Sequence, residues 1–161
     1  AGQCEKKGIN VLKATSETSQ EWEGRFDFVI CSEVIEHVFS PDNFIMSIKR
    51  LLSNEGLCLV TGLGYEGFDI LNLQECSASI SPPHHLNFLS IDGYRKLFLR
   101  TGFDSIDIKT LGELDVEIVL QSNMTDEWIR VLRKRGDSTL KAFQKFLQDY
   151  NLSSHIWVWA K

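Results

Sequence analysis

Two glutamates and a histidine stand close together in the segment Glu33-Val-Ile-Glu36-His37. Carboxylates and imidazoles are the side chains that most often exchange protons with a reacting group. In a helical turn, positions i, i+3 and i+4 share one face, so Glu33, Glu36 and His37 would lie together. Val34 and Ile35 would then point to the core. The spacing predicts two carboxylates and one imidazole grouped for acid–base chemistry.

The element that must position this group is the strand before it. Residues 26–32 form a short apolar run with Val29 and Ile30 at its centre, typical of a strand buried on both faces of a parallel sheet. In open α/β sheets, ligands bind beyond the carboxyl ends of the strands. The acid–imidazole segment follows at that end, where such a fold carries its chemistry.

The rest of the chain alternates between predicted strands and helices. Helix starts are predicted at Ser40-Pro41-Asp42, Ser90, Thr125 and Asp137 or Ser138. Residues 1–7 are also predicted as helical, and residues 114–120 are predicted as a helix in preference to a strand. Further strands are predicted at residues 9–13, 57–61, 103–111 and 155–160, and residues 15–24 are predicted as a loop or short helix. This order predicts an α/β fold with a mostly parallel sheet.

Residues 62–87 form a long connection that ends in Pro82-Pro83-His84-His85. A connection of this length in a compact domain is usually functional. His84 and His85 therefore join the candidate group, either on the substrate side of a site or as residues that lock the loop.

Composition narrows the class of protein. The 161 residues are enough for one domain, and the net charge of −5 with a pI near 5.4 argues against general binding to nucleic-acid backbone. No apolar stretch is long enough to span a membrane and no signal peptide is evident, so a cytoplasmic protein is expected. Cys31 and Cys58 lie in strand-like runs and are predicted to be reduced core thiols.

The motifs resemble one family when they are taken together. The segment FDFVICSEVIEHVFSPDNFIMSIKRLLSNEGLCLVTG is similar to the fourth strand, fourth helix and fifth strand of class I S-adenosylmethionine-dependent methyltransferases. Pro83-His-His-Leu-Asn-Phe-Leu-Ser90 and the terminal His155-Ile-Trp-Val-Trp-Ala160 also match this superfamily. The resemblance covers nearly the whole chain, from about residue 5 to residue 161.

This resemblance implies a Rossmann-like methyltransferase sheet of order 3-2-1-4-5-7-6, incomplete at its N-terminal side. The last strand would run antiparallel between residues 57–61 and 103–111, and residues 113–150 would be a helical insertion in a single partial domain, residues 1–161. The family's glycine-rich cofactor loop and ribose-binding acid are missing, so the chain resembles the C-terminal two thirds of a domain. We expect weak cofactor binding, with strand 9–13 or a second copy covering the free edge.

The resemblance also implies site residues. Cys31, Ser32 and Glu33 would line the S-adenosylmethionine pocket, and Thr15 and Ser16 lie where the family contacts adenine, although a plain loop fits them equally well. The implied reaction is methyl transfer to an oxygen of a small or sugar-like acceptor in a bacterium, with His37 and His85 as the catalytic residues.

Two further hypotheses remain open. In small-RNA 2′-O-methyltransferases and ubiquinone-pathway O-methyltransferases, a matching motif holds a divalent ion. By that resemblance, Glu33, Glu36, His37 and His85 (or His84) would bind Mg²⁺ or Mn²⁺. Many relatives carry the motif with no known metal. The last hypothesis is a non-catalytic module acting in assembly.

Overall fold

A computed structural model of the chain describes residues 2–11, 15–18, 20–122 and 126–161. The strands are β1 (Phe26–Ser32), β2 (Leu52–Leu63), β3 (Ile106–Thr110) and β4 (His155–Ala160). The α-helices are α1 (Gly2–Lys6), α2 (Pro41–Leu51), α3 (Phe68–Leu73), α4 (Ile91–Arg100), α5 (Asp115–Gln121), α6 (Glu127–Lys134) and α7 (Asp137–Asp149). Short 3-10 turns are η1 (Ser16–Thr18), η2 (Gln20–Trp22), η3 (Ile35–His37) and η4 (Gln74–Cys76).

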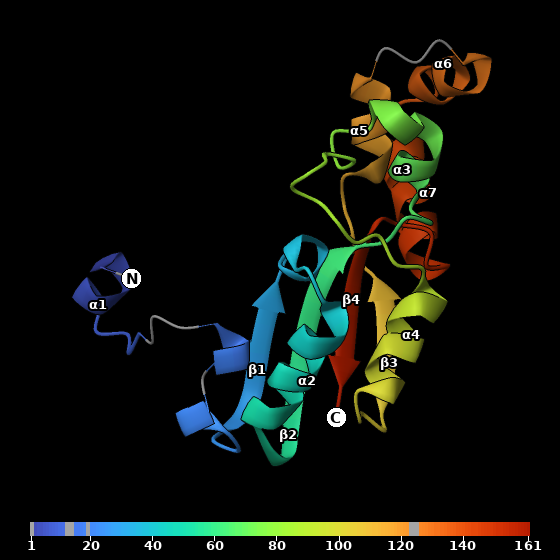
Figure 1. Cartoon of the computed structure of the whole chain (residues 1–161). Helices are drawn as coiled ribbons and strands as arrows, with labels where there is room; N and C mark the ends of the chain where they lie inside the picture. The colour runs from blue at the N-terminus through green and yellow to red at the C-terminus, as the bar shows by residue number, and fades with distance from the viewer. Residues whose placement is uncertain (1, 12–14, 19, 123–125) are drawn as a thin grey trace.

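The four strands form one sheet in the order β1-β2-β4-β3 (Figure 1). β1 and β2 are parallel, whereas β4 runs antiparallel to both of its neighbours, β2 and β3. This arrangement reproduces the last four positions of the predicted order. The α/β fold class and the antiparallel terminal strand are therefore confirmed.

β1 differs from its prediction because it lies at the edge of the sheet. Its side chains Phe28 and Ile30 are 44% and 62% exposed, so the strand is not buried on both faces. Among the described residues nothing pairs with its free side; residues 9–11 are not in a strand, and the rest of predicted strand 9–13 lies outside the described residues. Val29 and Cys31 point to the face covered by α2 and pack on the core, whereas Phe28 and Ile30 point to the opposite face and remain partly in solvent.

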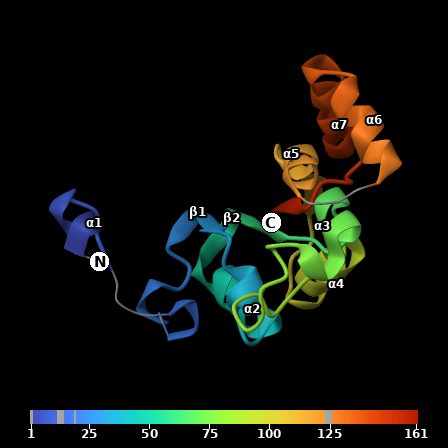
Figure 2. The ribbon, with the colours of Figure 1, turned by 90° about the horizontal axis from the view of Figure 1, so that it is seen from above.

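Helices α2 and α4 cover one face of the sheet (Figures 1 and 2). Both begin where the sequence predicted, because the hydroxyls of Ser40 and Ser90 accept hydrogen bonds from backbone N–H groups of the first turn, and Pro41 occupies the first position of α2. Their apolar sides form the core with the strands; the core members are Ile35, Phe44, Ile45, Ile48, Leu52, Cys58, Val60, Tyr94, Leu97, Phe98, Phe103, Ile108, Ile156, Val158 and Ala160.

β2 starts earlier than predicted. The sequence predicted a strand over residues 57–61, but the chain passes from α2 directly into β2 at Leu52. Leu52 pairs with Phe26, and a register shift follows between Phe26 and Phe28. Pairing with β1 therefore extends β2 beyond the apolar run that marks it in the sequence.

Helices α3, α5, α6 and α7 gather beyond the carboxyl ends of β1 and β2, whereas α1 lies apart on the other side of β1 (Figure 1). Residues 115–121 are helical, as favoured over a strand, and α7 begins at Asp137 as predicted. The predicted cap Thr125 lies outside the described residues, and the assignment of residues 113–150 as an insertion stays a prediction. None of the described helices combines the length and the apolar character needed to cross a bilayer.

Candidate functional site

The turn that follows β1 has a left-handed residue at its start and a short helical turn at its end. Glu33 adopts a left-handed backbone conformation, with φ of 52°, and the helical turn spans only Ile35–His37. Ile35 and Glu36 are each 1% exposed, whereas Val34 is 38% exposed, so the predicted inward direction holds for Ile35 alone. Glu33 consequently does not share a face with Glu36 and His37.

A close approach to β2 buries this turn. A Cβ atom at Gly62 would lie 2.6 Å from the Ile35 side chain and 2.8 Å from the Tyr94 hydroxyl. Only a residue without a side chain allows β2 to pass this near to the turn. Gly62 therefore sets how deeply Glu36 is buried.

The end of the long connection docks on the same turn. The carbonyl oxygen of Glu36 accepts hydrogen bonds from the backbone N–H groups of Leu86, at 2.7 Å, and Asn87, at 3.2 Å. The Asn87 side-chain amide donates to the carbonyls of Ile35 and Val38, at 3.2 and 2.6 Å. These four bonds place His85 beside the turn that carries Glu36 and His37.

His37 and His85 face one another with ring centroids 4.7 Å apart. Nδ1 of His37 lies 2.7 Å from the carbonyl oxygen of His84, and Nδ1 of His85 lies 2.5 Å from the carbonyl oxygen of Ser79. A carbonyl can only accept, so each Nδ1 carries a proton, and the lone pair of the neutral form is on Nε2. His84 contributes its backbone and not its ring to this arrangement.

One possible ligand atom from each of Glu36, His37 and His85 lies within 4.8 Å of the others. The Glu36 carboxylate is buried, and its Oε2 has no hydrogen-bond partner among the described residues. Burial raises the pKa of Glu36 and the charge of Glu33 adds to this, against the opposing effects of its own backbone and the two histidines. A buried carboxyl oxygen with two imidazoles nearby suits a proton or a cation.

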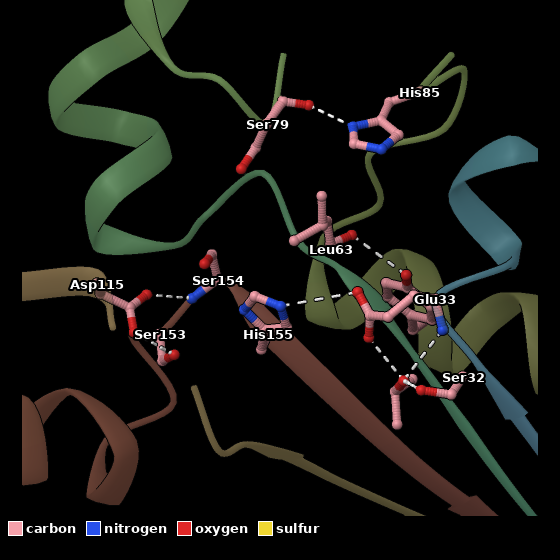
Figure 3. A network of polar contacts seen from close by, with 11 residues as sticks. Ser32, Glu33, Leu63, Ser79, His85, Asp115, Ser153, Ser154 and His155 are labelled. Carbon is pink, nitrogen blue, oxygen red and sulfur yellow. Dashed lines mark hydrogen bonds and ion pairs between the residues drawn. The ribbon is translucent and has the colours of Figure 1, made fainter. Parts of the chain in front are cut away.

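Glu33 belongs to a second, adjoining network (Figure 3). Its carboxylate accepts a hydrogen bond from the Thr61 hydroxyl at 2.7 Å, and its other oxygen lies 3.7 Å from Nε2 of His155. Its backbone N–H donates to the Thr61 carbonyl, and the Ser32 hydroxyl lies 3.2 Å from that of Thr61. His155, the first residue of β4, was missed because its partner in β2 is Leu63, which lies beyond the strand predicted over residues 57–61.

The other predicted cofactor residues lie in two places. Cys31 and Ser32 end β1 next to this group, and burial, with smaller contributions from Glu36 and Glu33, raises the pKa of the Cys31 thiol to about 11. Thr15 hydrogen-bonds with Thr18, and η1, which begins at Ser16, packs against α2. The structure thus groups Cys31 and Ser32 with Glu33 and places Thr15 and Ser16 beside a helix.

A hollow of about 540 Å³ lies elsewhere, between α5 and α7. Its lining includes Val116, Leu140 and Lys141 but no residue of the two networks above. This hollow is therefore separate from the candidate site at the strand ends.

Comparison with known protein families identifies the kind of domain. Residues 4–108, more than half of the chain, match the family model of a methyltransferase domain. A search of curated protein sequences gives no significant match.

Solved structures share the fold at low sequence identity. An S-adenosylmethionine-dependent methyltransferase of Thermotoga maritima, a possible histamine N-methyltransferase, is 18% identical with a TM-score of 0.63, covering 98% of this chain and 65% of its own. A counterpart of Archaeoglobus fulgidus is 12% identical with a TM-score of 0.56, covering 99% and 80%. The [4+2]-cyclase SpnF is 14% identical with a TM-score of 0.58, covering 100% and 61%.

These structures establish the fold alone, and the presence of a cyclase among them shows that the fold does not fix the reaction. The chain spans 65% of the length of the Thermotoga maritima protein. The family model and the strand order β1-β2-β4-β3 both indicate a methyltransferase fold. The chain belongs to the methyltransferase-domain family.

Proposed function

We propose that this chain serves S-adenosylmethionine-dependent methyl transfer to an oxygen of a small or sugar-like acceptor. The observation that supports it is the group of Glu36, His37 and His85 beside the carboxyl end of β1. A hydroxyl must lose its proton as it becomes the nucleophile, and a neutral imidazole with a free Nε2 can accept it. The carbonyls bonded to Nδ1 of His37 and His85 hold the tautomer in which the lone pair is on Nε2.

The described residues supply one wall for the cofactor. Cys31 and Ser32 end β1, and the left-handed backbone of Glu33, the next residue, directs its carboxylate to the strand ends. S-adenosylmethionine would supply an electrophilic methyl group on a sulfonium, so the role of the chain is alignment and removal of the proton. The free side of β1 contributes nothing to this wall among the described residues, so binding by this chain should be weak.

Titration with S-adenosylhomocysteine, followed by amide NMR spectra, tests this proposal. We expect fast-exchange shifts confined to amides around Ser32 and Glu33 and a Kd weaker than about 1 mM, equivalent to about −4 kcal/mol. Glu33→Gln should reduce the shifts, whereas Asp107→Asn, a change on the exposed edge strand β3, should leave them unchanged.

The two adverse outcomes have different meanings. No shift at the strand end at several-fold higher ligand concentration would contradict the proposed function. Saturation well below a millimolar would leave the function intact and show that residues 1–161 bind the cofactor tightly on their own.

A divalent ion offers a second route to the same chemistry, because a bound cation also lowers the pKa of a hydroxyl. The buried carboxyl of Glu36, whose Oε2 has no hydrogen-bond partner among the described residues, and the imidazoles of His37 and His85 form a mixed ligand set. With two imidazoles beside one carboxylate, this set suits Mn²⁺ better than Mg²⁺. Glu33, bonded to Thr61, is outside this set. In this version Glu36, His37 and His85 hold the ion, and open positions on it remain for acceptor oxygens.

Anomalous scattering from crystals soaked in Mn²⁺ decides between ion and base. The metal-dependent version predicts a peak between Glu36, His37 and His85 that is lost in His85→Ala. His155→Ala is the matched control, because His155 lies in the adjoining network, and it should keep the peak. An absent peak, or one that persists in His85→Ala, would leave proton removal by the histidines as the mechanism.

A different candidate function, assembly, is favoured by the free edge of the sheet. Phe28 and Ile30 on β1 are exposed, whereas the opposite edge strand β3 exposes the charged Asp107 and Lys109. Charged residues protect an edge from pairing, and an apolar edge invites it. In this version a second copy pairs with β1 to form a homodimer.

Size-exclusion chromatography with light scattering tests this version. If the edge mediates assembly, the chain will be a dimer, Ile30→Lys will be a monomer, and Leu99→Lys will remain a dimer. Leu99 is a fair control because it is 52% exposed on α4, away from this edge. A monomeric parent chain, or a dimeric Ile30→Lys variant, would contradict it.

A further inference from the structure

Asp69 on α3 is a buried carboxyl group that the proposed reaction does not use. It is 1% exposed, and neither carboxyl oxygen has a hydrogen-bond partner among the described residues. The hydroxyl of Ser154, also 1% exposed, is unpartnered in the same way. The Asp69 carboxyl lies against Ser154 and against a second carboxylate, Asp115. Three neighbouring buried oxygens, two of Asp69 and one of Ser154, thus have no hydrogen-bond partner among the described residues.

Asp115, in contrast, is surrounded by donors (Figure 3). Its oxygens accept hydrogen bonds from the Ser154 N–H, the Ser153 hydroxyl and the Gln144 amide, each at 2.7 Å. These are the partners of an ionised carboxylate, and although burial opposes them, they hold the pKa of Asp115 below its ordinary value. Asp115 therefore carries the negative charge of the pair.

No cationic side chain among the described residues forms an ion pair that would neutralise a second carboxylate beside Asp115. No ion pair among the described residues involves Asp69 or Asp115. The elements that meet here bring Asp69 from α3, Asp115 from α5, neutral Gln144 from α7, and His155 from β4, whose imidazole is directed to Glu33. Two adjacent buried carboxylates cannot both be ionised without a large free-energy cost.

A single proton on Asp69 would give all three unpartnered oxygens a hydrogen-bond partner. A protonated Asp69 donates its O–H to Asp115, and the Ser154 hydroxyl donates to the remaining Asp69 oxygen. A metal ion would need more oxygen ligands than the pair and one serine offer. We propose that Asp69 and Asp115 share a single buried proton, and that this proton fastens the connection carrying His85 to the helices above the sheet.

The position of Asp69 and Asp115 shows which segments the shared proton would hold together. Asp69 lies in the connection that leads to His85, and the same stretch docks through Gly64 N–H to the Ser154 carbonyl and Phe68 N–H to the Leu152 carbonyl, each at 2.8 Å. A Cβ atom at Gly67 would lie 2.3 Å from Ser154, so the contact is tight. Ionisation of Asp69 would place two like charges inside this junction and loosen it.

The sign of the pH effect follows from linkage. Burial raises the pKa of Asp69, the Ser154 hydroxyl opposes this, and the charge of Asp115 raises it further. The native state then holds the proton more tightly than the unfolded chain. Stability from this group is complete below the ordinary carboxyl pKa of about 4 and is lost as the pH rises through the native pKa.

Thermal unfolding of the wild-type chain and of Asp69→Asn between about pH 5 and about pH 9 tests the proposal. An asparagine amide donates to Asp115 and its oxygen accepts from Ser154, so the variant copies the protonated acid. We expect the wild-type Tm to fall as pH rises, and the variant Tm to fall by less than half as much. Asp107→Asn, at a side chain that is 65% exposed, should follow the wild type.

A direct titration keeps the proposal testable if Asp69→Asn fails to fold. The side-chain carboxyl ¹³C signal of Asp69 in the wild-type chain should titrate well above the ordinary value of about 4. Titration at or below that value would overturn the proposal. An equal dependence of Tm on pH in the wild type and in Asp69→Asn would also overturn it. A rise in Tm on addition of Ca²⁺ that is lost in Asp69→Asn would overturn it as well, because a cation would then occupy the place of the proton. All these readouts are independent of methyl transfer.

Discussion

The candidate site depends on one backbone contact, in which the chain at Leu86 and Asn87 docks on the turn after β1. The Glu36 carbonyl accepts two N–H donors from this segment, and the Asn87 amide returns two hydrogen bonds to the turn. Backbone groups buried in this way must find partners, so the contact fixes both segments at once. Because the histidine before Leu86 is carried along, His85 meets residues almost fifty positions earlier in the chain. Without this contact, Glu36 and His37 would stand alone.

The same contact creates the electrostatic character of the site. It seals Glu36 beneath the connection, while Gly62 lets β2 approach from the other side. A carboxylate that is removed from water is stabilised by whatever positive charge or proton comes near, and the two imidazoles are the nearest sources. Glu33, only three residues earlier, remains half-exposed and pairs with Thr61 and His155. Two glutamates of one short motif thus have separate environments and separate chemistry.

Features that depend on local sequence could be predicted, and features that depend on distant contacts could not. Ser40 with Pro41, and Ser90, mark helix starts through hydrogen bonds within one turn, and the apolar runs mark β1 and β4. The strand order followed from resemblance to a family. The left-handed backbone of Glu33 could not be foreseen, because it depends on Thr61 in a neighbouring strand. The pairing of Asp69 with Asp115, likewise, joins segments that carry no common signal in the sequence.

Amide hydrogen exchange at Leu86 tests the central contact most directly. Its N–H is bonded to the Glu36 carbonyl at 2.7 Å, so it should exchange slowly in the parent chain. Asn87→Ala removes two supporting bonds and should speed this exchange by about tenfold or more, at roughly 1 kcal/mol for each bond. The amide of Leu152, bonded to the Leu147 carbonyl, should keep its rate. Fast exchange at Leu86 in the parent chain, or no change in Asn87→Ala, would contradict this account of the site.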